Sequence, residues 1–150
     1  MDIVHLASEF SPIAKVGGLA DVTAGLSKSL YKHGENVEVI LPFYEHIDKS
    51  KLKNLQIVAD NFPTQLETHT SKNTIYRAES DGVLLTLVEP KNDYFKRDNI
   101  YGYEDDDMRF MYFTKVSMDY LLNIKKELDI LHLHDWLTSL AAPLYNLLYK

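Results

Sequence analysis

The sequence predicts an α/β fold with a Rossmann-like, open and mostly parallel sheet that carries a small antiparallel insertion. Two observations predict this class. Apolar strand-like runs alternate with segments of helical periodicity near both ends of the chain, which is typical of parallel sheets with crossover helices. Between them lie short strand-like runs without helical periodicity, which favour antiparallel pairing. At 150 residues the chain has room for one hydrophobic core.

The first part of the chain has the pattern of a strand, a helix and a second strand. Residues 2–7 are an apolar run and predict a buried first strand. Apolar side chains then recur at three- and four-residue steps, which predicts a helix over residues 19–33 with Gly34 as its stop. Residues 36–41 predict the second strand, so the chain begins as a βαβ unit.

The rest of the chain predicts the insertion and then a return to the parallel sheet. Polar turns separate four short strands, predicted over residues 55–59, 65–70, 74–79 and 83–88. A long apolar face predicts a helix over residues 107–126. A strand over residues 130–134 and a final helix over residues 137–148 follow.

The composition is that of an ordinary globular domain, with 45% hydrophobic and 25% charged residues. Sixteen basic and 22 acidic side chains leave a formal charge of −6, which disfavours nucleic acid as a partner. No run approaches the roughly 20 apolar residues of a membrane span, and no basic, apolar leader precedes the first strand. The lack of cysteine excludes disulfides and thiolate metal sites. We therefore expect a bacterial cytoplasmic protein, or a plastid protein whose transit peptide has been removed.

A glycine pair lies between the first predicted strand and the first predicted helix. Gly17 and Gly18 follow Lys15 there. Unpaired amides at a helix N-terminus and residues without a Cβ let an anion approach closely, and Lys15 adds positive charge. A tight turn beside a solvated lysine is the alternative, and these residues alone leave both interpretations open. The two common phosphate motifs, Gly-x-x-x-x-Gly-Lys-Ser/Thr and Gly-x-Gly-x-x-Gly, are absent.

Four sequence motifs, the first of which contains this glycine pair, follow one another along the chain. They are Ser-Glu-Phe-Ser-Pro with Lys-Val-Gly-Gly-Leu-Ala-Asp-Val, Asn-Asp-Tyr-Phe-Lys-Arg with Ile-Tyr-Gly, Asp-Asp-Asp-Met-Arg-Phe, and His-Leu-His-Asp-Trp, within residues 8–22, 92–102, 105–110 and 132–136. In this order the chain is similar to the N-terminal region of bacterial glycogen synthases and plant starch synthases. These are retaining glucosyltransferases with the two-domain GT-B fold.

The resemblance implies that residues 1–150 are one truncated N-terminal domain, with the C-terminal nucleotide-binding domain missing. It implies transfer of glucose from ADP-glucose, a substrate rather than a cofactor, to the nonreducing 4-OH of an α-1,4-glucan with retention of configuration. No metal or other cofactor is implied. The isolated chain is expected to be inactive, because half a cleft neither positions both substrates nor excludes water. The alternatives are another GT-B glycosyltransferase, such as a sucrose-synthase-like or phosphorylase-like enzyme, and a noncatalytic glucan-binding module.

The resemblance assigns catalytic roles to Lys15, Asp21 and His134. Lys15 would pair with the pyrophosphate of the donor, while the amides of Gly17 and Gly18 would reach the distal phosphate and the glucosyl unit. Asp21 resembles a residue on the sugar side of the cleft, although a first-turn carboxylate favoured by the helix dipole is the alternative. His134 would turn its backbone carbonyl towards the anomeric carbon and its side chain towards the sugar hydroxyls.

The last motif also raises the question of a metal site. His132 and His134 alternate to one face of the predicted strand, and Asp135 follows them. We expect no metal, because the sequence places no third strong ligand beside them. Trp136 is expected to pack in the core rather than to stack on a ligand.

The two middle motifs predict a substrate-binding surface for the sugar. Asp105 and Arg109 resemble the family's Asp-Asn-x-x-Arg-Phe stretch, and the rings of Tyr94 and Phe95 suit a glucan acceptor. Asp106 replaces the usual asparagine, which exchanges an amide donor for an acceptor-only carboxylate. The alternatives are a helix cap with a favourable first turn for the aspartates, an ion pair with one of them for Arg109, and core packing for the aromatic residues.

Overall fold

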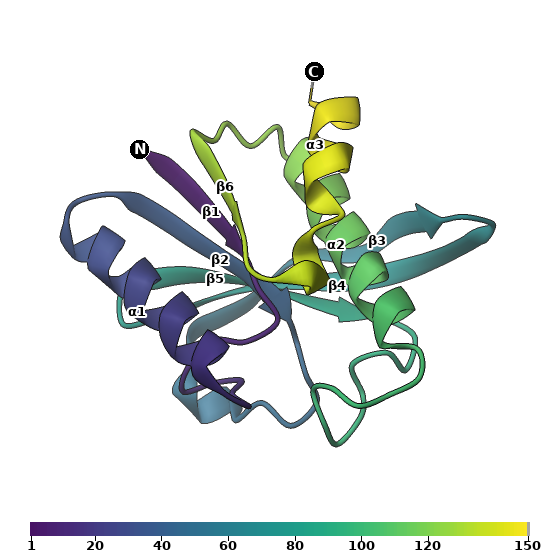
Figure 1. Cartoon of the computed structure of the whole chain (residues 1–150), viewed down its shortest axis with the longest axis horizontal. Coiled ribbons are helices and arrows are strands. Elements are labelled where there is room, and N and C mark those ends of the chain that lie inside the picture. Colours follow the sequence, from purple (N-terminus) through teal and green to yellow (C-terminus); the bar gives the residue numbers. More distant parts are fainter. Residues whose placement is uncertain (150) are drawn as a thin grey trace.

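Four parallel strands form the centre and one edge of a six-stranded sheet in a computed structural model that describes residues 1–149. The strands are β1 (Asp2–Leu6), β2 (Asn36–Pro42), β5 (Val83–Pro90) and β6 (Ile130–Leu133). They lie in the order β5-β2-β1-β6, so β1 pairs with β2 on one side and with β6 on the other (Figure 1). The predicted class, an open and mostly parallel α/β sheet, is confirmed.

The antiparallel part of the sheet is a single long hairpin. Its strands are β3 (Lys53–Leu66) and β4 (His69–Ser80), and β4 also pairs antiparallel with β5. The short strand predicted over residues 65–70 is wrong, because the chain turns at residues 67–68 inside it. No glycine or Asn-Gly signal marks this turn, and Glu67 adopts a positive φ of 56°. Register shifts in β3 also break the alternation that would have revealed one long strand.

Helices cover both faces of the sheet. Helix α1 (Gly18–Lys32) connects β1 to β2, and α2 (Asp106–Asn123) lies in the connection from β5 to β6. The two connections run across the sheet in opposite directions, and right-handed crossovers then place the helices on opposite faces (Figure 1). A short 3₁₀ turn, η1 (Lys49–Lys51), precedes the hairpin.

The final predicted helix is divided into two elements. These are the 3₁₀ turn η2 (Trp136–Thr138) and the helix α3 (Ala141–Leu148), which packs beside α2. Pro143 explains the late start of α3, since proline lacks a backbone N–H and is tolerated only in the first helical turn. None of the helices within residues 1–149 is long and apolar enough to cross a membrane.

The main core lies between the sheet and its helices. Its fully buried side chains come from the central strands and from α2, and they include Leu6, Val39, Leu85, Phe110 and Phe113. Since this core fixes the central strands, the loops at their carboxyl ends have a rigid base.

Candidate functional site

The carboxyl ends of β1 and β6 meet at the point where the sheet reverses its order. The amide of His134 donates to the carbonyl of Leu6 over 3.1 Å, so the chain leaving β6 lies against the chain leaving β1. In open α/β sheets such a switch point is where ligands bind, because adjacent loops diverge there and leave a crevice. The motif with the glycine pair follows β1 and the His-Asp-Trp motif follows β6, as the sequence predicts.

The glycine pair stands at the start of α1, with Gly17 as the N-cap residue and Gly18 as the first helical residue. Neither glycine is required by its backbone, since the φ of Gly17 is −152° and Gly18 is helical. Packing does not require them either, because a Cβ on either residue would meet no atom of the chain within 4 Å. The tight-turn alternative therefore has no support. The open space suits an external ligand that approaches the backbone closely.

The amides of this loop are divided between an internal partner and open positions. The carboxylate of Glu9, which is only 3% exposed, accepts from the amides of Val16 and Gly17 over 2.6 and 3.0 Å. The Gly17 amide is thus already bonded, contrary to its predicted role as a phosphate donor. The amides of Gly18 and Leu19 come next in the helix, where no helical acceptor exists, and they form no bond within residues 1–149.

Lys15 and Asp21 form an exposed ion pair beside the same helix N-terminus. The ammonium group contacts both carboxylate oxygens at 2.8 Å, and this contact lowers the pKa of Asp21 below its usual value. Both side chains are half-exposed, so the pair can open at little cost when a stronger anion arrives. The predicted residues Lys15, Asp21 and Gly18 therefore lie together at one anion-accessible position.

His134 is buried at the same end of the sheet, against the end of β1, and is not exposed as Lys15 and Asp21 are. Its side chain is 5% exposed, and its Nε2 is 2.9 Å from Nδ1 of His5. Its carbonyl accepts from the hydroxyl of Thr138 over 3.1 Å. Burial lowers the pKa of His5 to about 3 and that of His134 to about 4, with the neighbouring histidines adding to the effect, so both rings are neutral at pH 7. Direct contact between His134 and a sugar stays a prediction.

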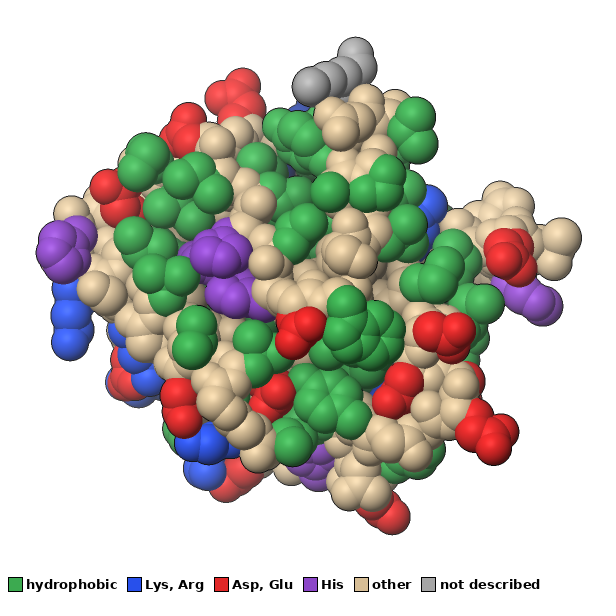
Figure 2. All heavy atoms as spheres, in the orientation of Figure 1, with side chains coloured by type: hydrophobic (Ala, Val, Ile, Leu, Met, Phe, Trp, Pro, Cys, Tyr) green, Lys and Arg blue, Asp and Glu red, His purple; other side chains and the backbone are tan. Residues whose placement is uncertain are grey.

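His5 adds a third imidazole to the two foreseen from the sequence, and histidine side chains gather at the surface over β6 (Figure 2). One nitrogen from each of His5, His132 and His134 lies within 4.8 Å of the others. However, the rings of His132 and His134 stack at 4.2 Å with only 4° between their planes, and His5 is tilted by no more than 30° from either. A metal is bound along lone pairs in the ring plane, and stacked planes do not converge on one point. The arrangement favours a cluster of packed rings over a metal site.

The residue after His134 has an unusual backbone. Asp135 has φ 66° and ψ 179°, a region that is almost restricted to glycine and costs roughly 1–3 kcal/mol for other residues. Its carboxylate accepts from the amide of Trp136 over 2.6 Å and otherwise faces solvent. Such backbone strain at the carboxyl end of a parallel strand, here the edge strand β6, is typical of functional sites. The sequence could not reveal it, because nothing in the residue type predicts a positive φ here.

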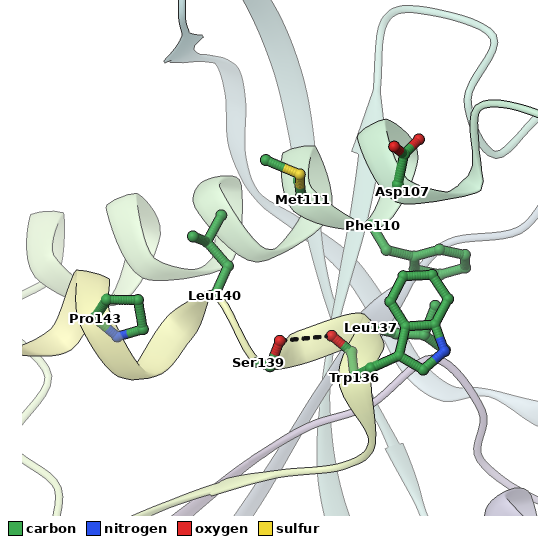
Figure 3. Close-up of a pocket in the computed structure, with 8 residues that line it drawn as sticks. All are labelled: Asp107, Phe110, Met111, Trp136, Leu137, Ser139, Leu140 and Pro143. Carbon is green, nitrogen blue, oxygen red and sulfur yellow. Dashed lines mark hydrogen bonds between the residues drawn. The ribbon is translucent and has the colours of Figure 1, made fainter.

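Trp136 corrects the expectation of core packing, because 58% of its surface is exposed. Its ring forms one wall of an open cavity of about 460 Å³ between α2 and the η2–α3 segment (Figure 3). The floor and opposite wall are largely apolar, with Phe110, Met111, Leu140 and Pro143. A neighbouring cavity of about 290 Å³ is lined by Tyr101, Asp106, Asp135, Trp136 and Leu137. Together these cavities make one aromatic and acidic groove.

The two cavities of this groove are not lined by any of the predicted acceptor residues Tyr94, Phe95, Asp105 and Arg109. Arg109 is fully buried, so the expectation that it binds substrate is wrong for this structure. Its guanidinium donates to the carbonyls of Tyr94 and Ile100 and to the carboxylate of Asp106, which holds the loop before α2 in place. Phe95 is also buried, at 2% exposure, and the core alternative applies to it.

Asp105 and Tyr94 lie closer to the surface but have internal partners. Asp105 accepts two bonds from Arg97, at 2.6 and 2.9 Å, and this contact lowers the pKa of its carboxyl group. Tyr94 is half-buried with its ring against Tyr112. Asp106, which departs from the family motif, lines the smaller cavity instead. A ligand contact by Asp105 or Tyr94 stays a prediction.

The fold and the site together define a class of protein. A doubly wound α/β domain with an open anion position at its switch point is a nucleotide-binding type of domain. Residues 2–150 match the family described as starch synthase catalytic domain, and the chain belongs to that family.

Similar proteins are known from plants and bacteria. The chain is 39% identical to probable starch synthase 4, chloroplastic/amyloplastic, of Arabidopsis thaliana, over 98% of this chain and 14% of the relative. It is 37% identical to glycogen synthase of Protochlamydia amoebophila, over 100% of this chain and 30% of the relative. Its structure matches the catalytic domain of starch synthase IV from Arabidopsis thaliana bound to ADP and acarbose. That match has a TM-score of 0.93 and 38% identity, over 99% of this chain and 30% of that one. The chain thus spans less than a third of each relative.

Proposed function

We propose that this chain is the first part of the N-terminal domain of a longer α-1,4-glucan synthase. The whole enzyme transfers glucose from ADP-glucose to the nonreducing 4-OH of a glucan with retention of configuration, and a C-terminal domain completes the cleft. Relatives named glycogen synthase and starch synthase support this assignment, as does a similar structure bound to ADP and acarbose. ADP-glucose is the substrate, and no further cofactor is needed.

The observation that carries the proposal is the open N-terminus of α1. Two glycines stand there that neither the backbone nor the packing of this chain requires. The unbonded amides of Gly18 and Leu19 and the positive end of the helix dipole favour a phosphate oxygen at this position. Lys15 moves from Asp21 to the diphosphate and neutralises its charge as the glycosidic bond breaks. This is electrostatic stabilisation of the leaving group rather than proton transfer.

Asp21 and His134 complete the donor side of the proposed site. When Lys15 pairs with the diphosphate and leaves Asp21, the exposed Asp21 carboxylate can accept hydrogen bonds from sugar hydroxyls. His134 forms the neutral wall behind the glucosyl unit, where its carbonyl dipole stabilises positive charge at the anomeric carbon.

The groove beside Trp136 is the proposed acceptor side. An exposed indole face suits the apolar face of a glucose ring, and the nearby carboxylates of Asp106 and Asp135 accept bonds from sugar hydroxyls. The groove and the glycine pair flank the same sheet edge, so donor and acceptor can meet there. We infer that the chain alone is inactive, because the second domain is needed to position the substrates and exclude water. A bacterial cytoplasmic or plastid location stays a proposal.

The test is transfer of labelled glucose from ADP-glucose or UDP-glucose to glycogen by the full-length protein. The expected result is turnover with ADP-glucose that Lys15→Ala lowers by roughly 10²-fold or more, as for the loss of one transition-state donor. Lys32→Ala is the matched control, because Lys32 is an exposed lysine in the last turn of the same helix, at the end opposite to the glycine pair. No transfer from either donor by folded protein would favour a glucan-binding module or another GT-B activity.

A further inference from the structure

Glu9 is a buried carboxylate whose oxygens join two parts of the proposed site. One oxygen accepts the amides of Val16 and Gly17, and the other accepts the hydroxyl of Tyr101 over 2.7 Å. We propose that Glu9 is a positioning residue that couples the donor loop to the acceptor groove through Tyr101. This inference rests on the proposed function and adds a communication between its two substrate positions.

We call these contacts of Glu9 with Val16, Gly17 and Tyr101 the junction. Its bonds to the two loop amides explain why a buried carboxylate lies beside a loop that is proposed to bind an anion. A segment with two glycines has large conformational freedom, and ordering it when the ligand binds would weaken binding. Glu9 orders the segment beforehand by holding two amides that a phosphate does not use. The amides of Gly18 and Leu19, one residue further on, remain open for the ligand. Glu9 thus acts on the donor through backbone geometry and not by contact.

The acceptor arm runs through the phenol of Tyr101. Its oxygen lies 2.6 Å from the hydroxyl of Ser8, so Ser8 donates to Tyr101 while Tyr101 donates to Glu9. Burial raises the pKa of Tyr101, which keeps the phenol protonated and able to donate. The same side chain lines the cavity that holds Asp135 and Trp136. A glucan that contacts Tyr101 in this cavity therefore changes the hydrogen bond from Tyr101 to Glu9, the carboxylate that also holds the donor loop.

Coupling of this kind is reciprocal. If an occupied groove strengthens the bond from Tyr101 to Glu9, the donor loop becomes better ordered and ADP-glucose binds more tightly. By thermodynamic linkage, donor binding must then strengthen glucan binding by the same factor. Loss of the phenol hydroxyl should remove this mutual effect while leaving Lys15 and the loop amides in place.

The test uses the full-length protein with Glu9→Gln, Tyr101→Phe and the double variant. ADP affinity is measured by calorimetry with and without a maltooligosaccharide, beside the KM values for both substrates. Tyr101→Phe is expected to weaken ADP binding by roughly 10-fold, the usual loss for one hydrogen bond to a charged group. This loss is expected even though Tyr101 lines the acceptor groove and not the donor position. The double variant is expected to lose little more than either single variant, because both break one junction.

Two matched controls come from the same chain. Glu38→Gln changes another buried carboxylate, which accepts from Thr86 on the central strands, and Tyr112→Phe removes a buried phenol that donates to Asn73. Neither should alter ADP affinity. Unchanged ADP affinity in Tyr101→Phe, or additive losses in the double variant, would overturn the coupling.

A second readout separates this proposal from the proposed function. Hydrogen exchange of the Val16 and Gly17 amides reports on the junction whatever the donor is. It should become faster in Tyr101→Phe as well as in Glu9→Gln. Exchange that stays as slow as in the native protein in Tyr101→Phe would contradict the junction. If exchange is faster but no glucose is transferred and no ADP binds in the native protein, the proposed function fails and the positioning role of Glu9 stands.

Discussion

Two motifs of this chain follow parallel strands, yet they use their polar residues in opposite ways. In the segment after β1, Lys15 and Asp21 face solvent, and the glycines leave open space around them. In the segment before α2, Arg109 and Phe95 face inward, and Asp105 is bonded to Arg97. The first motif leaves an anion-accessible position open, whereas the second mainly holds its own loop in place. A residue's presence in a family motif therefore does not tell which way its side chain points.

The strongest test of this difference is Arg109→Ala. The variant leaves the carboxylate of Asp106 and two backbone carbonyls without their donor and opens a cavity in the core. We expect a loss of about 3–5 kcal/mol in the free energy of unfolding, measured by urea denaturation. Lys115→Ala on the same helix removes a cation from a partly buried i,i+4 pair with Asp119 and should cost less, about 1 kcal/mol. A small effect of Arg109→Ala would contradict its structural role.

The buried histidines His5 and His134 lie near the end of the strand that precedes the first motif, and they predict that the stability of the chain depends on pH. The folded pKa values of His5 and His134, about 3 and 4, lie below the ordinary value near 6.5. The unfolded chain therefore takes up protons first, so their contribution to stability is complete above about pH 6.5 and falls as the pH drops towards 4. The slope is at most about 1.4 kcal/mol per pH unit for each ring.

Urea unfolding between pH 7.5 and 4.5 measures this slope. His5→Asn should reduce it by about half, since one buried imidazole remains. His69→Gln removes an exposed histidine at the hairpin turn and serves as the control, with a slope equal to that of the native chain. An unchanged slope in His5→Asn would show that His5 does not contribute to the loss of stability in acid.

Much of the fold could be predicted because hydrophobic periodicity depends on which face is buried. The apolar runs located all four parallel strands, and the glycine after His33 located the end of α1. The sequence predicted three short strands where the structure has the two long strands β3 and β4. The prediction failed because bulges in β3 interrupt the alternation and the turn at Glu67 lacks the usual turn residues. Local patterns thus failed where strand pairing overrides them.

The site was less predictable because its features depend on orientation. The sequence indicated Lys15 and the glycine pair, whose chemistry lies in the residue types themselves. It could not indicate that Glu9 binds two loop amides, that Asp135 has a strained backbone or that Trp136 is exposed. These depend on distant segments: Tyr101 lies 92 residues from Glu9 in the chain, and His5 lies 129 from His134.

A smaller effect, with opposite signs for stability and function, is expected for Gly18→Ala. Alanine in the first turn of α1 should raise the free energy of unfolding by up to about 1 kcal/mol, because the backbone there is helical and a Cβ meets nothing. The same Cβ occupies the space proposed for a phosphate, so ADP affinity should fall. Gly34→Ala is the control for the stability arm, since its φ of 90° makes alanine destabilising there. Stabilisation without loss of ADP affinity would mean that this space is not used by the ligand.

The smallest effect on stability is expected for Trp136→Ala, and this variant sharpens the contrast between exposed and buried motif residues. Because most of the indole is exposed, its removal should change the free energy of unfolding by about 0.5 kcal/mol or less. Glucan affinity of the full-length protein should nevertheless fall by about 10-fold, since a stacking contact of an aromatic ring is worth roughly 0.5–1.5 kcal/mol. Phe110→Leu changes a buried ring below the same groove and should do the reverse, lowering stability more than affinity. Equal losses of stability and affinity in Trp136→Ala would show that the indole supports the loop rather than the glucan.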